Sequence, residues 1–240
     1  MNQYTQVDST PTPVHGIRRP SRRRRVVAAL GLAAAAAVGG GGSAVRADTA
    51  PVTPFRTVMV GDSIGNIVYP LVNTPDLYWD AEPGRSPYDV GADDRAGTVE
   101  ALATLMPLLA PSTSGHPTFV VVQEGATGTL DGRYITNSEW QDFVRDVIRL
   151  TGGHCLVFVS PGYGHTINGV ANEAGNDVAY GRTIMARDIL DDYPWRCIYT
   201  VNWWYAADRN PQFLRADGLH PSAAGAAWLA SQLNQILPNP

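Results

Sequence analysis

The 240-residue sequence contains no lysine and only two cysteines, and it has no long uninterrupted apolar run. All eighteen positive residues are therefore arginines, and beyond the N-terminal region each of them stands singly. Proteins that bind nucleic acids cluster such residues to neutralise phosphates, so the sequence argues against a nucleic-acid partner. Histidine and cysteine are not grouped at the spacing of metal ligands, so the sequence also argues against a metal site.

The first 47 residues have the pattern of an export signal. A polar segment ends in four arginines at residues 22–25, an Ala-rich apolar run of thirteen residues follows at 26–38, and residues 45–47 offer a cleavage site. A membrane-spanning helix needs roughly 20 apolar residues, so a signal peptide is favoured over a transmembrane anchor. The arginines resemble a twin-arginine signal, with Sec export as the alternative.

Removal of residues 1–47 would leave an acidic mature chain, with eleven positive and twenty-one negative residues and a formal net charge of −10. Such a charge favours solubility and neutral or cationic substrates. Residues 48–55 form a Pro-rich lead-in, and residues 56–240 are long enough for one compact domain. We therefore expect a single exported domain that does not insert stably into a membrane, and nothing in the sequence indicates its oligomeric state.

Strand-like and helix-like segments alternate along the mature chain. Near-continuous apolar runs, typical of strands covered on both faces, stand at residues 56–60, 118–122, 156–159 and 198–201. Helical patterns stand at residues 95–109, 138–151, about 174–191 and after Ser222. For the second helix we expect a capping box of Ser138 and Gln141. The alternation predicts a three-layer α/β/α sandwich with a mainly parallel sheet, whose site lies at the carboxyl ends of the strands.

The two cysteines, Cys155 and Cys197, each open one of the predicted strands. If those strands are parallel neighbours, their starts lie at similar heights, and export makes a disulfide feasible. Two buried free thiols are the alternative.

Two short motifs carry the candidate chemistry. Gly61-Asp62-Ser63 directly follows the first predicted strand, so a tight turn could present the serine hydroxyl; a helix cap is the alternative. Asp217 precedes His220 by three residues on one short loop, where the carboxylate could orient the ring and the ring could take the serine proton; a turn with an incidental histidine is the alternative. His165 competes for the base role, but we expect it to lack a suitable carboxylate.

In this order the motifs resemble those of the SGNH (GDSL) hydrolase family, across residues 57–236. The family's four blocks correspond to residues 61–64, 80–85, 123–128 and 217–221. The resemblance implies a flavodoxin-like sheet, with Ser63 as the nucleophile and with His220 and Asp217 completing a catalytic triad. It also implies an oxyanion hole formed by the amides of Ser63 and Gly84, and it requires neither a cofactor nor a metal.

The third oxyanion donor is the departure from the family pattern. The family has an asparagine amide there, whereas Thr127 stands at the matching position. A threonine hydroxyl can donate but is shorter, and loss of one such donor costs about 10²–10³ in rate. Asn202, after the last strand, is a possible substitute, although a strand-end hydrogen bond is the favoured role for it.

The block at residues 80–85 and the Trp203-Trp204-Tyr205 stretch look most like extracellular SGNH domains of cell-wall O-acetyltransferases and carbohydrate acetylesterases. The resemblance implies a secreted serine esterase that hydrolyses short-chain, chiefly acetyl, esters of small molecules or carbohydrates. One alternative is an O-acetyltransferase acting on envelope polysaccharide. The other is a noncatalytic carbohydrate-binding module on a decayed hydrolase fold.

Overall fold

The computed structural model describes residues 54–88, 97–113, 115–124, 129–130 and 133–238, and the statements below concern these residues. The expected signal peptide at residues 1–47 lies outside them, as do Thr127 and most of the lead-in at 48–55.

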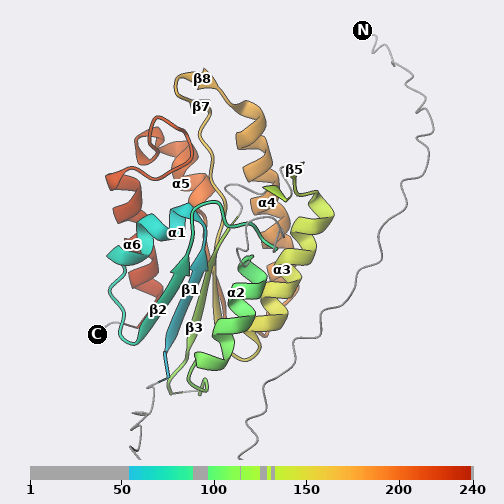
Figure 1. Cartoon of the computed structure of the whole chain (residues 1–240), viewed down its shortest axis with the longest axis vertical. Coiled ribbons are helices and arrows are strands. Elements are labelled where there is room, and N and C mark those ends of the chain that lie inside the picture. Colours follow the sequence, from blue (N-terminus) through green and yellow to red (C-terminus); the bar gives the residue numbers. More distant parts are fainter. Residues whose placement is uncertain (1–53, 89–96, 114, 125–128, 131–132, 239–240) are drawn as a thin grey trace, which may run out of the picture. The chain divides into compact units, whose positions relative to one another are not determined.

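A five-stranded parallel sheet in the order β2-β1-β3-β6-β9 forms the centre of the fold (Figure 1). Its strands are β1 (Thr57–Gly61), β2 (Leu77–Ala81), β3 (Phe119–Gln123), β6 (Cys155–Val159) and β9 (Ile198–Val201). Every residue of β1, β3 and β6 is buried, which explains their near-continuous apolar sequences. The register pairs Gly61 with Ala81 on one side and with Gln123 on the other, so the carboxyl ends of these strands lie level.

Helices cover both faces of this sheet (Figure 1). On one face, α1 (Ser63–Val68) and α6 (Ala223–Ile236) share an apolar core with Met59 and Val121. On the other face, α2 (Thr98–Leu105), α3 (Asn137–Thr151) and α4 (Glu173–Asp191) share a second core with Val58 and Val60. The expected three-layer α/β/α architecture is therefore confirmed. None of the described helices is long and apolar enough to cross a membrane.

Smaller elements connect these layers. They are η1 (Tyr69–Leu71), η2 (Met106–Leu108), α5 (Trp203–Arg209), η3 (Pro211–Phe213), the hairpin of β4 (Thr129–Leu130) with β5 (Arg133–Tyr134), and the hairpin of β7 (Thr166–Ile167) with β8 (Val170–Ala171).

The start of α3 differs from the expectation. The helix is capped by Thr136, whose hydroxyl accepts from the Glu139 amide at 3.2 Å while the Glu139 carboxylate accepts from the Thr136 amide at 2.7 Å. The predicted box of Ser138 and Gln141 is therefore wrong. The same spacing occurs two residues earlier, and there it places a carboxylate in the first turn, where the helix dipole favours negative charge.

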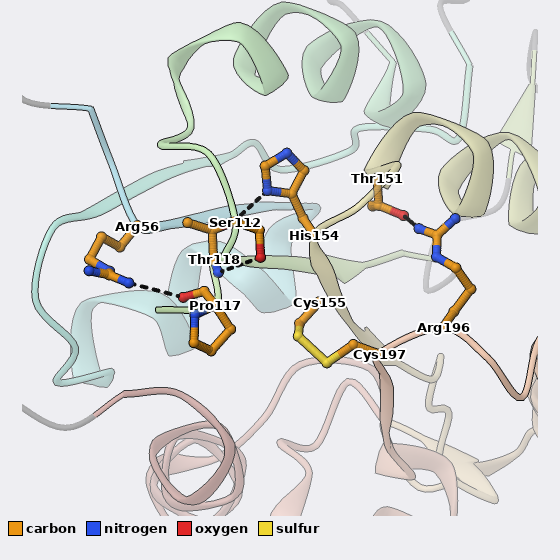
Figure 2. Close-up of a disulfide and its surroundings, with 9 residues drawn as sticks. All are labelled: Arg56, Ser112, Pro117, Thr118, Thr151, His154, Cys155, Arg196 and Cys197. Atoms are coloured by element: carbon orange, nitrogen blue, oxygen red, sulfur yellow. Dashed lines mark hydrogen bonds between the residues drawn. A yellow bond between two sulfur atoms is a disulfide. The ribbon is translucent and has the colours of Figure 1, made fainter. Parts of the chain in front are cut away.

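A disulfide between Cys155 and Cys197 joins the first residue of β6 to the residue before β9 (Figure 2). Their Cα atoms are 4.6 Å apart, because the two strands are parallel neighbours that begin at the same height. The alternative of two free thiols is thus excluded. Nearby, the Arg196 guanidinium donates to the Thr151 hydroxyl at 3.2 Å, which links the segment before β9 to the end of α3. The disulfide lies at the amino ends of the strands, opposite the loops that follow their carboxyl ends.

Candidate active site

Ser63 is held by a turn between β1 and α1. Asp62 is the N-cap of α1, and its buried carboxylate accepts from the Ile64 amide at 2.8 Å. The Gly65 amide donates to the side-chain oxygen of Gln123 at the end of β3, at 2.9 Å. The capping role therefore belongs to Asp62, and Ser63, only 7% exposed, directs its hydroxyl elsewhere.

Gly61 allows the close approach of this turn to β3. A Cβ atom at that position would lie 2.9 Å from the carbonyl oxygen of Gln123 and 3.0 Å from the Tyr69 hydroxyl. Tyr69 itself donates to the carbonyl oxygen of Val60 at 3.0 Å. Glycine at position 61 thus allows the end of β1 to lie directly beside the end of β3.

The loop before α6 brings the candidate base to this serine. Nε2 of His220 lies 2.9 Å from the Ser63 hydroxyl oxygen, although the two residues are 157 positions apart. Nδ1 of His220 lies 3.0 Å from Oδ2 of Asp217. Since the carboxylate favours a hydrogen on Nδ1, the other ring nitrogen can accept the hydroxyl hydrogen of Ser63. The three side chains form one hydrogen-bonded chain.

Asp217 is oriented by its own loop. Its Oδ1 accepts from the amides of Leu219 and His220, both at 2.9 Å. Burial raises the pKa of this carboxyl group, but the two amides and the His220 side chain outweigh burial, so the pKa lies below its ordinary value. Asp217 is therefore a carboxylate at neutral pH, as a group that stabilises an imidazolium must be.

Gly84 lies in the turn that follows β2. The Arg85 amide donates to the Glu82 carbonyl oxygen at 3.1 Å, so Pro83 and Gly84 occupy the centre of this turn. Gly84 has a φ of 77°, in the left-handed region that favours glycine. The Glu82 amide donates to the Gly61 carbonyl oxygen at 3.1 Å, which ties the Gly84 turn to the end of β1, two residues before Ser63.

The sequence offers two candidates for a third oxyanion donor, Thr127 and Asn202, and only Asn202 can be placed in the structure. Thr127 lies outside the described residues. Asn202 caps α5, where its side-chain oxygen accepts from the Tyr205 amide at 2.9 Å. The strand-end hydrogen bond expected for Asn202 is therefore present.

His165 does have carboxylate partners, contrary to the expectation. Its Nδ1 lies 2.8 Å from the Glu173 carboxylate, and its Nε2 lies 2.7 Å from the Asp208 carboxylate. Hydrogen bonds from Glu173 and Asp208 raise its pKa above the ordinary value. Sequence reasoning missed these contacts because the partners belong to α4 and α5. Because both of its ring nitrogens are bonded to carboxylates, His165 links α4 to α5 and is not arranged as a base for Ser63.

The His165 loop also packs against the loop of Asp217. The Gly164 amide donates to the Gly218 carbonyl oxygen at 2.7 Å, and the Asn168 amide donates to the Ala216 carbonyl oxygen. Gly218 has a φ of 64°, and a Cβ atom there would lie 2.1 Å from the Thr166 carbonyl oxygen. These contacts hold the loop of Asp217 and His220 against the loop that follows His165.

The tryptophans after β9 have separate roles. Trp203 is fully buried and stacks on Phe213 with ring centroids 6.4 Å apart, so it belongs to the core. Trp204 is partly buried, packs against Tyr180 at 4.7 Å and donates its indole hydrogen to Asn176 at 2.9 Å. Within the described segments, no three His, Cys, Asp or Glu side chains are grouped so that they could hold a metal ion.

No family model and no curated protein matches this sequence. Solved structures do resemble it. A lipase/acylhydrolase from Enterococcus faecalis is 18% identical with a TM-score of 0.55, over 76% of this chain and 95% of that chain. The C-terminal catalytic domain of a peptidoglycan O-acetyltransferase from Streptococcus pneumoniae, solved with a methylsulfonyl adduct, is 18% identical with a TM-score of 0.54, over 77% and 97%. A carbohydrate acetylesterase family member from Sinorhizobium meliloti is 16% identical with a TM-score of 0.52, over 76% and 98%. At these identities the likeness shows the fold alone.

Proposed function

We propose that this chain, which has the fold of the SGNH (GDSL) hydrolases, is a secreted serine esterase for short-chain, chiefly acetyl, esters. Ser63 is the nucleophile, His220 is the general base and Asp217 orients the ring. One observation carries the proposal, namely the contact of 2.9 Å from Ser63 to His220 continued by the contact of 3.0 Å to Asp217. A capping serine beside an incidental histidine would not require such a chain of hydrogen bonds.

In the first half of the reaction the Ser63 oxygen attacks the ester carbonyl carbon while Nε2 of His220 takes the hydroxyl proton. The carbonyl electron pair moves to its oxygen, and the amides of Ser63 and Gly84 stabilise that oxyanion, with Thr127 as the proposed third donor. When the tetrahedral intermediate collapses, the bond to the alcohol oxygen breaks and the imidazolium returns its proton to the leaving alcohol. The acyl group is then bound to Ser63.

Water completes the cycle by the reverse sequence. His220 takes a proton from water, the resulting oxygen attacks the acyl carbon, and the carboxylic acid leaves as Ser63 recovers its proton. Asp217 stays ionised throughout and stabilises each imidazolium. General-base assistance of this kind is worth about 10²–10⁴ in rate.

Three features support the finer parts of the proposal. The disulfide supports export, since disulfides persist in oxidising compartments. The leader-like pattern of residues 1–47 supports export independently. The structural likeness to a carbohydrate acetylesterase and to a peptidoglycan O-acetyltransferase domain makes acetylated carbohydrate of the cell envelope the substrate to test first.

The test is hydrolysis of p-nitrophenyl acetate by the mature protein and its Ser63→Ala variant. We expect turnover and covalent labelling by a fluorophosphonate in the parent, and neither in the variant. A panel of acyl chain lengths should show rates that fall as the chain lengthens. Turnover that survives Ser63→Ala would refute the assignment, and a folded parent that resists the label would favour a noncatalytic binding module.

The identity of the acyl acceptor needs a separate measurement, because a transferase would use the same triad. Product analysis with an acetyl donor, with and without a sugar acceptor, resolves it. We expect free acetate as the main product in both cases. Acetylated sugar formed faster than acetate would instead identify an O-acetyltransferase.

A further inference from the structure

Arg85 is a buried cation in the loop after β2, with only 2% of its side chain exposed. Its Nη1 donates to the carbonyl oxygen of Asp80 at 2.7 Å, and its Nη2 lies 2.7 Å from the carboxylate of the same residue. Nη2 also lies 3.6 Å from the Glu82 carboxylate. A guanidinium is a rigid planar fork, so two contacts to one residue fix its position more firmly than a single ion pair would.

The loop that Arg85 closes is the one that carries Gly84. The guanidinium reaches back to Asp80, within β2, while the Arg85 amide closes the turn on Glu82. Gly84 therefore lies between Glu82 and Arg85, within a loop that the Arg85 side chain and main chain both close. Because the Glu82 amide is bonded to Gly61, this loop is also fixed relative to the turn of Ser63.

The segment after Arg85 is anchored as well. The carbonyl oxygen of Ser86 accepts from the Thr98 amide at 2.9 Å, and that of Pro87 accepts from the Val99 amide at 3.1 Å. These bonds fasten the chain to the first turn of α2. Two sets of contacts thus hold the main chain that follows Gly84. Ser86 and Pro87 bond to α2, and Arg85 bonds to Asp80.

We propose that Arg85 is a positioning residue for the oxyanion hole. The inference rests on the proposed function and deepens it. The Arg85 fork sets the direction of the Gly84 N–H, which stabilises charge that develops only in the transition state. Arg85 itself does not contact substrate. Lysine cannot replace it, because one ammonium group cannot bond the Asp80 carbonyl and carboxylate in the same planar geometry.

The test compares Arg85→Lys with the parent on p-nitrophenyl acetate, with kcat expressed per site titrated by the fluorophosphonate. We expect kcat to fall by roughly 10–100-fold, part of the 10²–10³ that a lost donor costs. We expect KM to change less than about threefold and the pH profile to keep its shape, since the triad is untouched. Arg149→Lys is the control, because it alters an exposed Arg–Asp pair on α3.

Two further variants make the outcome decisive. Arg85→Lys combined with Gly84→Ala should lose no more activity than the worse single variant, because both act through one amide. Asp80→Asn leaves Arg85 in place and weakens the pair at a residue that is 30% exposed, so it serves if Arg85→Lys does not fold; we expect a smaller fall in kcat at constant KM.

An unchanged kcat per titrated site in Arg85→Lys or, if that variant does not fold, in Asp80→Asn would overturn the inference. So would a rise in KM alone, or losses that multiply in the double variant. A parent without Ser63-dependent turnover would instead overturn the proposed function, so the two failures are distinguishable.

Discussion

Removal of the disulfide should weaken folding strongly and catalysis little. The bond joins Cys155 to Cys197 across a sequence separation of 42 residues. The loop-closure model then gives an entropy cost of about 13 cal/mol/K for the unfolded chain, or about 4 kcal/mol at 25 °C. The bond lies at the amino end of β6, and a five-residue strand spans roughly 16 Å, so the turn of Ser63 should keep its geometry.

The measurement is urea unfolding of the same protein with and without a reductant, which avoids the cavity that a substitution would leave. With an m value of about 2 kcal/mol per M, the midpoint should fall by about 2 M on reduction. The double variant Cys155→Ala/Cys197→Ala should fall at least as far and should not respond to the reductant. Turnover of p-nitrophenyl acetate at 25 °C should stay within about twofold. Equal midpoints in the oxidised and reduced protein would refute the loop-closure argument.

Two other predictions concern the charged side chains near the site. Asp217→Asn should keep an oxygen for the Leu219 amide but no longer favour the reactive tautomer, so kcat should fall by about 10³–10⁴; a variant with more than a tenth of the parent kcat would show that another group orients the ring. Because the pKa of His165 is raised in the folded protein, its pairs with Glu173 and Asp208 stabilise the fold fully below the ordinary histidine pKa and lose this effect as the pH rises through the raised value. The gap in urea midpoint between the parent and His165→Gln should therefore close between pH 5 and pH 9, and a constant gap would contradict this account.

The strands that the sequence predicts are those with near-continuous apolar runs. β1, β3 and β6 are buried on both faces and read as continuous apolar runs. β2 was not predicted because Asp80 interrupts its apolar pattern. The other edge strand, β9, was predicted from its uninterrupted apolar run, but the expectation that both of its faces are covered is wrong, since Tyr199 is 43% exposed. The two short hairpins have strands of two residues each, too few to show any periodicity.

The candidate site also has some residues that could be predicted from the sequence and others that could not. Ser63, Asp217 and His220 stand in short motifs whose order along the chain could be recognised, and the structure brings them into contact. The partners of His165 could not be anticipated, since Asp208 is 43 positions away and on another helix. The burial of Arg85 was equally invisible, because a guanidinium is usually exposed and only the three-dimensional path of the chain after β2 encloses it.

The separation of 157 residues between Ser63 and His220 has a consequence for how the protein can be observed. Long-range contacts of this kind tend to form late, since the entropy of closing the chain must first be overcome. If Ser63 is the nucleophile that we propose, a refolding chain should react with a fluorophosphonate only after the segment before α6 has docked. The onset of labelling, compared with the signals of secondary structure, would then report when that docking occurs.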